Sequence, residues 1–187
     1  GGEIFKALEE HRMLPDIRDR IAANKKTRDE LLSKESPVPK SARRILVTGC
    51  PMSGVYSKIV NAVEQNGGVV TAFENCEAIK PAIRHFDTEN EDILEAFADC
   101  YQNTACAIMS PNTVRFQLIG QLARDYAADG VLDVTLQTCH PYTVERDKMM
   151  RLCKDTLHLP YIAVETDTSD SDMGQLNTRI AAFIEML

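Results

Sequence analysis

The chain has no long apolar run and no excess of positive charge. None of its apolar stretches approaches the roughly 18 residues that a membrane span needs, and no secretory signal peptide stands at its start. The formal net charge of −7 leaves no basic face for a nucleic acid or an anionic membrane. With 44% apolar residues, the composition is that of a globular domain. We therefore expect a cytoplasmic protein with neither of these partners.

The cysteines form no C-x-x-C pair. Six are present, at positions 50, 76, 100, 106, 139 and 153, and this spacing supports neither a compact zinc knuckle nor a thioredoxin-like redox motif. The reducing conditions of the cytoplasm also disfavour disulfides. The thiols are therefore a mixture of buried structural residues and ligands that the fold brings together.

Glycine motifs for nucleotide phosphates are also absent. The stretch G-C-P-M-S-G-V-Y-S-K, residues 49–58, begins like a phosphate loop, but Val55 follows its last glycine where the motif requires lysine. The dinucleotide motif G-x-G-x-x-G does not occur either. The turn could present backbone N–H groups to an anion, but the sequence predicts no nucleotide site of either kind.

The sequence does contain a regular alternation of strand and helix patterns. Short apolar runs predict strands over 44–49, 69–73, 131–136 and 161–166. Four such strands separated by helices indicate a parallel sheet covered on both faces. We expect an α/β domain that is Rossmann-like (flavodoxin-like), with three layers, a four-stranded parallel sheet and strand order 2-1-3-4.

Helical patterns fill the intervals between these strands. The interval between the second and third strands is too long for a loop and predicts a helical insertion. The expected helices cover 57–66, 92–101, 113–126 and 174–187.

The first 42 residues follow a different pattern. Helical spacing covers 3–14 and 15–33, with Pro15 in the first turn of the second helix, and S-P-V-P-K-S at 36–41 is a linker by composition. We therefore divide the chain into two parts. The N-terminal helices form a helical connector over 1–42, and a Rossmann-like domain covers 43–187. The chain begins with Gly1 and Gly2 in place of a methionine. This start indicates either residues left by cloning or a domain cut from a longer protein.

Three cysteines lie near the ends of predicted strands. Cys76 follows the second strand, Cys139 follows the third, and Cys106 lies in a loop of the insertion that begins at the same edge. Ligands bind at this edge in open α/β sheets, so the three thiols could form one site for a soft or borderline metal, as iron–sulfur cluster or zinc ligands. Three unrelated buried thiols are the alternative. Cys50 ends the first strand at this edge and is a possible fourth ligand, with a thiol that supports the ligands or merely a small residue at a turn as the alternatives.

Other candidate residues have simpler interpretations. Cys100 and Cys153 fall in helical patterns beside apolar residues, which favours core packing. His140 at a helix start is either a metal or cluster contact, or a capping or solvent-facing residue. The acidic segment 165–172 lacks the glycine and final glutamate of a calcium loop. Helix capping accounts for part of it, and contact with a substrate or partner could account for the rest.

Five blocks of the sequence carry a resemblance to a known family. They read R-I-L-V-T-G-C-P, V-V-T-A-F-E-N-C, A-C-A-I-M-S-P-N, D-G-V-L-D-V-T-L-Q-T-C-H-P-Y-T-V-E and I-A-V-E-T-D followed by G-Q-L-N-T-R-I-A-A-F-I-E-M-L. The most specific pieces are L-x-x-C-x-x-Y-x-x-E and Q-L-x-T-R-I-x-A-F-x-E. Over 43–187 the chain resembles the C-terminal domain of the 2-hydroxyacyl-CoA dehydratase and benzoyl-CoA reductase subunit family, which includes the 2-hydroxyglutaryl-CoA dehydratase D-component.

The resemblance implies a cofactor and several partners. Such subunits pair two Rossmann-like lobes around an iron–sulfur cluster, which an ATP-hydrolysing activator protein reduces at very low potential. In the dehydratases an electron passes to an acyl-CoA thioester, and the resulting ketyl radical expels the hydroxyl group. The implied partners are a missing N-terminal lobe, a second subunit or homodimer partner, the ATP-dependent activator, and an acyl-CoA or other small substrate.

The resemblance also implies roles for individual cysteines. Cys139 matches a cluster ligand of the dehydratases, while Cys76 and Cys106 resemble the additional cysteines of the double-cubane cluster proteins. Thr104 departs from that branch, because a cysteine often stands there.

The implied function is that of the C-terminal cluster-binding domain of an ATP-dependent low-potential reductase or dehydratase, with a 4Fe–4S or double-cubane cluster. The alternatives are a double-cubane electron-transfer protein that acts on no acyl-CoA and a metal-free Rossmann-like scaffold. A Rossmann-like core should not depend on metal, so we expect the isolated domain to fold without the cluster and to be inactive.

Overall fold

A computed structural model describes residues 7–8, 10–52, 54–83 and 85–187. The chain divides into two compact units, Gly1–Ala42 and Arg43–Leu187, and each is described by itself. The role of the first unit as a connector stays a prediction.

Helix α2 (Ile17–Leu32) is the main element of the first unit. Its N-cap is Asp16, whose side chain accepts a hydrogen bond from the Arg18 backbone N–H at 2.8 Å. The prediction that Pro15 lies in the first turn is wrong, because the aspartate supplies the acceptor that a helix start needs and the helix begins after it. All residues of α2 are described and none is buried.

The earlier helix that the sequence predicts over 3–14 is described only in part. Residues 7, 8 and 10–12 are helical, and residues 3–6 and 9 lie outside the described residues.

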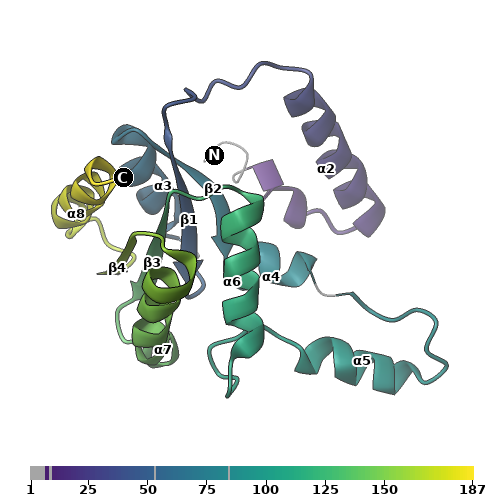
Figure 1. The fold of residues 1–187 in the computed structure, drawn as a ribbon. Coiled ribbons are helices and arrows are strands. Elements are labelled where there is room, and N and C mark those ends of the chain that lie inside the picture. The colour runs from purple at the N-terminus through teal and green to yellow at the C-terminus, as the bar shows by residue number, and fades with distance from the viewer. Residues whose placement is uncertain (1–6, 9, 53, 84) are drawn as a thin grey trace. The chain divides into compact units, whose positions relative to one another are not determined.

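The second unit is built on a four-stranded sheet with the order β2-β1-β3-β4, seen in Figure 1. Its strands are β1 (Arg43–Gly49), β2 (Gly68–Glu74), β3 (Gly130–Leu136) and β4 (Tyr161–Thr166). Every neighbouring pair is parallel. The predicted flavodoxin-like α/β class and the order 2-1-3-4 are confirmed, and all carboxyl ends of the strands lie at one edge.

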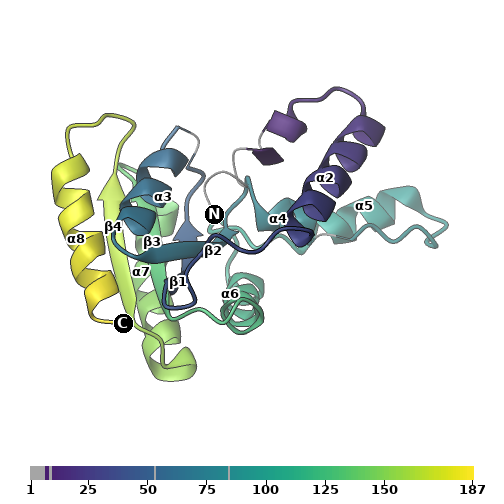
Figure 2. The ribbon, with the colours of Figure 1, turned by 90° about the horizontal axis from the view of Figure 1, so that it is seen from above.

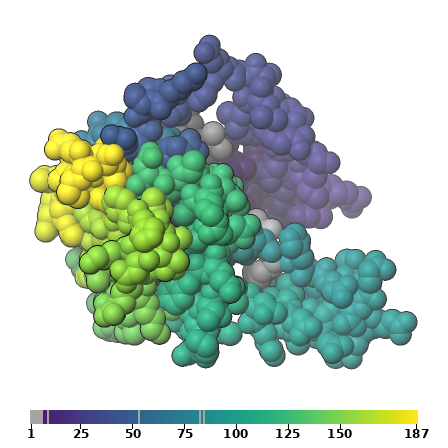
Figure 3. Space-filling view, viewed as in Figure 1, coloured from purple at the N-terminus to yellow at the C-terminus, as the bar shows by residue number. Residues whose placement is uncertain are grey.

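Helices cover both faces of this sheet, as Figure 2 shows. One face is covered by α3 (Tyr56–Gln65) and α8 (Met173–Glu185), which contact each other. The other is covered by α6 (Thr113–Asp125) and α7 (His140–Arg151), and α7 continues into the π-helical turn η1 (Leu152–Leu157). Figure 3 shows α6 and α7 side by side on the near face. The three predicted layers are therefore present.

The core follows from alternation along the strands. Leu46 and Val131 face α6 and α7, where they pack with Ile119, Met149 and Cys153 in one buried apolar cluster. Because successive strand residues point to opposite faces, their neighbours along the strands point toward α3 and α8. Cys153 is fully buried, so its predicted place in the core is confirmed.

The predicted insertion between the second and third strands is present. It contains α4 (Ile79–Ala82), α5 (Ile93–Gln102) and α6. Asp92 caps α5 by accepting hydrogen bonds from two backbone N–H groups of its first turn. The buried residue of α5 is Ala96, and Figures 1 and 2 both show α5 standing away from the sheet.

The end of β1 approaches β3 very closely. Gly49 has φ +130, and a Cβ atom there would lie 1.8 Å from the Val134 carbonyl oxygen. The backbone N–H of Cys50 donates to that same carbonyl at 3.2 Å. Glycine is therefore required at position 49, and it places Cys50 directly against the end of β3.

Among the helices that the structure describes, none has both the length and the apolar character that crossing a membrane demands.

Candidate functional site

The predicted ligand residues lie along the carboxyl edge of the sheet. Cys50 directly follows β1, Cys76 comes two residues after β2, and Cys139 is the N-cap of α7. Cys106 lies in the loop before α6, the helix that leads into β3. Cys76, Cys106 and Cys139 are half-buried, while Cys50 is buried.

A tight turn positions Cys139 at the start of α7. Thr138 adopts φ 68, a left-handed conformation in which β-branched residues are rarely found. The backbone N–H of Cys139 donates to the Leu136 carbonyl at 3.1 Å. This turn joins the end of β3 to the start of α7 and so places Cys139 at the edge of the sheet.

Cys50 lies near Cys139 at the end of β3. The Leu136 backbone N–H donates to Cys50 Sγ at 3.1 Å. Burial raises the pKa of Cys50 to about 11, and the neighbouring Cys139 also raises it. Cys50 is therefore a protonated thiol beside the more exposed Cys139.

Cys76 is linked to the same helix through Tyr142. Its Sγ lies 3.7 Å from the Tyr142 hydroxyl oxygen. Lys80 Nζ donates to that hydroxyl at 3.0 Å and lies 5.2 Å from the centre of the ring. Burial raises the pKa of Tyr142, so the hydroxyl keeps its proton.

A buried network of ionic side chains lies behind Tyr142. Glu74, at the end of β2, pairs with Lys80 Nζ at 2.8 Å and with Arg115 Nε at 3.3 Å. Arg115 Nη1 also pairs with Glu145 of α7 at 2.5 Å. Thr48 of β1 completes the network by donating to Glu74 at 2.5 Å and accepting from Arg115 Nη2 at 3.0 Å.

The charges of this network balance. Burial by itself would lower the pKa of Arg115, but the Glu74 carboxylate and the hydrogen bond to Glu145 outweigh it, and the pKa is raised. Arg115 therefore stays charged although its side chain is 1% exposed. Two cations face two carboxylates, which is the condition under which buried charges are tolerated.

Sequence reasoning quoted Tyr142 and Glu145 within the L-x-x-C-x-x-Y-x-x-E block but gave them no role, and it did not single out the other members of this network. Two weak signals for the network exist. Tyr142 and Glu145 follow Cys139 at intervals of three, which places all three on one side of α7. Arg115 occupies the apolar side of α6, three residues before Leu118. A polar residue on the inward side of an amphipathic helix is the signal that could have identified them.

The described residues do not gather the three predicted ligands into one metal site. Within the described ranges, no three His, Cys, Asp or Glu side chains are grouped so that they could hold a metal. Cys76 and Cys139 both adjoin the first turn of α7, whereas the recorded hydrogen bonds of Cys106 are backbone bonds within its own loop, to Thr104 and Met109. Partly exposed, reduced thiols such as these could serve as one or two ligands of a thiophilic metal group. The remaining ligands of that group would come from other parts of the complete protein. That these thiols bind iron stays a prediction.

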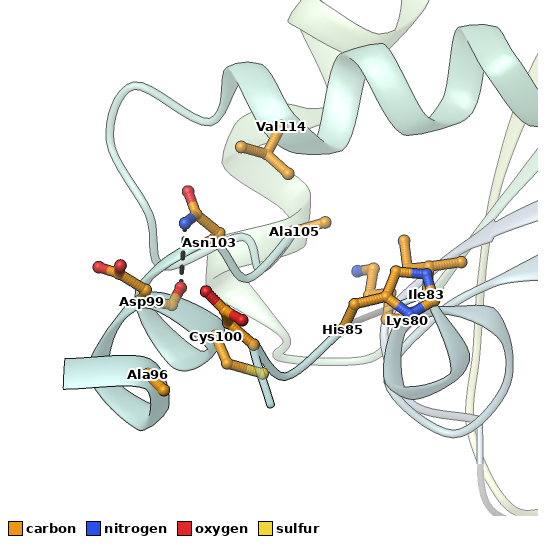
Figure 4. A pocket seen from close by; sticks show the side chains of 10 residues that line it. Lys80, Ile83, His85, Ala96, Asp99, Cys100, Asn103, Ala105 and Val114 are labelled. Atoms are coloured by element: carbon orange, nitrogen blue, oxygen red, sulfur yellow. Dashed lines mark hydrogen bonds between the residues drawn. The ribbon is translucent and has the colours of Figure 1, made fainter. Parts of the chain in front are cut away.

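A hollow of about 280 Å³ lies within the insertion, between α4, α5 and the start of α6, and Figure 4 shows it. Lys80 lines it, as do Asp99 and Cys100 of α5 and Asn103, the C-cap of that helix. Cys100 is therefore a half-buried residue on the wall of a hollow, and its predicted core packing is wrong because α5 stands away from the sheet. The remaining lining residues are Ile83, His85, Asp87, Ala96, Ala105 and Val114.

Comparison with known proteins identifies the family. The family model described as "2-hydroxyglutaryl-CoA dehydratase, D-component" matches residues 2–187. The chain belongs to this family. The family predicted from the sequence blocks is therefore confirmed.

Two curated relatives agree with this assignment. "Putative dehydratase subunit YjiM" of Escherichia coli (strain K12) is 48% identical over 77% of this chain and 37% of its own length. The "(R)-phenyllactyl-CoA dehydratase beta subunit" of Clostridium sporogenes is 23% identical over 85% of this chain and 41% of its own length. The chain thus spans about two fifths of the length of these relatives.

One solved structure shows a weak likeness. The metal-soaked Flv1 flavodiiron core from Synechocystis sp. PCC6803 is 13% identical, with a TM-score of 0.39, over 89% of this chain and 40% of that chain. A likeness this distant carries no argument about function.

Proposed function

We propose that this chain is the C-terminal iron–sulfur-cluster-binding domain of a cytoplasmic, ATP-dependent, low-potential reductase or dehydratase that acts on a 2-hydroxyacyl-CoA or a related small substrate. Membership of the family supports a dehydratase-type component. The name of the Clostridium relative supports an acyl-CoA substrate. The activity belongs to a larger assembly with an N-terminal lobe, a second subunit or homodimer partner, and an ATP-dependent activator protein.

The observation that carries this proposal is the placement of Cys139. It is half-buried at the edge of the sheet where ligands bind, and the turn at Thr138 together with the buried Tyr142 and Glu145 fixes the helix that it begins. A bound cluster would supply one-electron transfer at low potential. The chain itself supplies thiol ligands and a rigid, charge-balanced support for them.

The start of α7 is a favourable place for an anionic metal group. Cys139 lies at the N-terminus of α7, where the helix dipole stabilises negative charge. Arg115 Cζ lies 4.7 Å from the centre of the Tyr142 ring, and Lys80 is hydrogen-bonded to its hydroxyl. Both cations contact Tyr142, the neighbour of Cys76, and both are balanced by the carboxylates of Glu74 and Glu145.

The link between Cys76 and α7 favours a second candidate. By the resemblance, a plain dehydratase lobe needs one cysteine from this domain, yet Tyr142 ties a second thiol to the same helix. This favours a double-cubane protein that transfers electrons without an acyl-CoA site. Binding of coenzyme A thioesters by the complete protein distinguishes the two candidates.

The test is the anaerobic iron and acid-labile sulfide content of the complete protein and its serine variants. We expect Cys139→Ser to lose most of the iron, because a missing thiolate leaves the cluster an incomplete ligand set. Loss in Cys76→Ser and Cys106→Ser as well would favour the double-cubane candidate. Cys100→Ser, which removes a half-buried thiol on α5, is the matched control and should retain its iron. Unchanged iron in all of these variants would reject the proposal and leave the metal-free scaffold.

A further inference from the structure

The hydroxyl group of Tyr142 has one donor position and two neighbours. Lys80 Nζ lies 3.0 Å from its oxygen and Cys76 Sγ lies 3.7 Å from it. A lysine ammonium group can only donate. The Tyr142 oxygen therefore accepts from Lys80, and its own proton needs another acceptor.

The sulfur of Cys76 is the other hydrogen-bonding atom within reach of the hydroxyl, and by geometry alone either atom could be the donor. Tyr142 is 5% exposed, so water does not readily replace a missing partner, and a buried hydroxyl proton without an acceptor is costly. If Cys76 donated to Tyr142 instead, the phenol proton would lack any acceptor recorded among the described residues. The Tyr142 hydroxyl is therefore the donor of this hydrogen bond, and Cys76 Sγ is its acceptor.

The ring of Tyr142 is held in place from several sides. Lys80 is paired with Glu74 at 2.8 Å, and the Arg115 guanidinium stacks over the ring at 4.7 Å while it pairs with Glu145. Four elements, β2, α4, α6 and α7, contribute these contacts. A side chain with so many fixed neighbours is pre-organised, which is what a supporting residue around a ligand set requires.

We propose that Tyr142 is a positioning residue. It donates a hydrogen bond to Cys76 Sγ and so holds this sulfur in place as a ligand for the metal group. The inference rests on the proposed function for the metal and on the recorded contacts for the hydrogen bond. A donor to a ligand sulfur stabilises the added negative charge of the reduced state and raises the reduction potential. Tyr142 thereby contributes to setting the potential of the site.

The first test measures the midpoint potential of the iron-loaded complete protein. We expect Tyr142→Phe to retain its iron and to shift the potential to a more negative value, because the donor to the ligand sulfur is lost. Tyr56→Phe is the matched control. It also removes a buried hydroxyl at this edge, but that hydroxyl donates to Asn75 Oδ1 at 3.0 Å, so the potential should stay at the wild-type value. An unshifted potential in Tyr142→Phe, or an equal shift in both variants, would overturn the proposal.

The second test needs no metal. A double-mutant cycle of Tyr142→Phe and Cys76→Ala on the iron-free protein asks whether the hydroxyl and the thiol are coupled. We expect the double variant to lower the urea midpoint by less than the sum of the two single shifts, and the cycle of Tyr56→Phe with Cys76→Ala to be additive. An additive Tyr142 cycle overturns the hydrogen bond. If the wild-type protein binds no iron, the proposed function fails and this cycle alone decides the role of Tyr142.

Discussion

At the scale of single residues, Asp133 is a carboxyl group enclosed between β3 and the helices above it. It is 2% exposed, and the Tyr161 hydroxyl donates to its Oδ2 at 2.7 Å. Its Oδ1 has no hydrogen-bond partner within the described residues. Burial raises the pKa of Asp133, and the hydrogen bond from Tyr161 and the nearby Arg115 offset this only in part. Ionising this group therefore costs more in the folded than in the unfolded chain.

This cost gives the unfolding free energy a specific pH dependence. A carboxyl whose pKa is higher in the folded state contributes its full stability below the unfolded pKa of about 3.9 and loses it as the pH rises through the folded pKa. Relative to Asp133→Asn, the free energy of unfolding of the wild-type protein should fall as the pH rises. We expect a fall of about 1.4 kcal/mol for each unit by which the folded pKa of Asp133 exceeds its unfolded pKa. Urea unfolding between about pH 4 and pH 7 measures it.

The control for this prediction is Asp170→Asn, which changes an exposed carboxyl in the same way. A difference in unfolding free energy between wild type and Asp133→Asn that stays constant over this pH range, or that changes in the opposite direction, would contradict the expectation.

The sequence predicts the position of single site residues better than their partners. Cys139 is recognisable because it follows an apolar strand and opens a helix, and three-residue spacing puts Tyr142 and Glu145 on one side of that helix. Their partners Lys80 and Arg115 lie in the insertion, 62 and 30 residues away along the chain. No local pattern encodes a contact over such a separation, because it depends on how the insertion folds back on the sheet.

At the scale of elements, Arg115 connects the insertion to the sheet and to α7. Its guanidinium contacts Thr48 of β1, Glu74 of β2 and Glu145 of α7, while its backbone is in the first turn of α6. The Asn112 side-chain amide also donates to Glu145 at 2.8 Å. The start of α6 is therefore attached to α7 by two buried polar contacts.

We expect Arg115→Met to destabilise the protein by about 3–5 kcal/mol, because the change leaves the buried Glu145 without a cation and leaves Glu74 with Lys80 alone. Amide hydrogen exchange should show the largest loss of protection at the first turns of α6 and α7. The matched control is Arg124→Met at the exposed end of the same helix, which should change the free energy of unfolding by less than about 0.5 kcal/mol. A loss of under about 1 kcal/mol in Arg115→Met would show that the network does not fasten these helices.

The elements themselves are well encoded in the sequence. The four predicted strands match β1 to β4 within one residue at each end, because apolar β-branched runs between helical patterns have one reasonable interpretation in a parallel sheet. The error at the start of α2 has a local cause, since Asp16 and Pro15 are both common at helix starts. The outward position of α5 was not predictable, because an amphipathic pattern does not say which surface covers its apolar side.

At the scale of the whole molecule, the core of the second unit and the candidate ligands are separate parts of the structure. The apolar cluster under α6 and α7 contains Cys153, whereas Cys76, Cys106 and Cys139 are half-buried at the edge. Apolar burial of this kind is the main source of folding free energy. Removing a metal from the edge should therefore leave the core intact.

We expect the iron-free chain to unfold cooperatively, and Cys139→Ser to change its melting temperature by only a few degrees, as a typical change of about 1 kcal/mol would. The chain has no tryptophan, so amide dispersion in NMR spectra is a better measure of native packing than fluorescence. The control is Leu46→Ala, which removes a fully buried side chain and should cost about 2–5 kcal/mol. Poorly dispersed spectra without iron that sharpen on reconstitution would show that the fold depends on its metal.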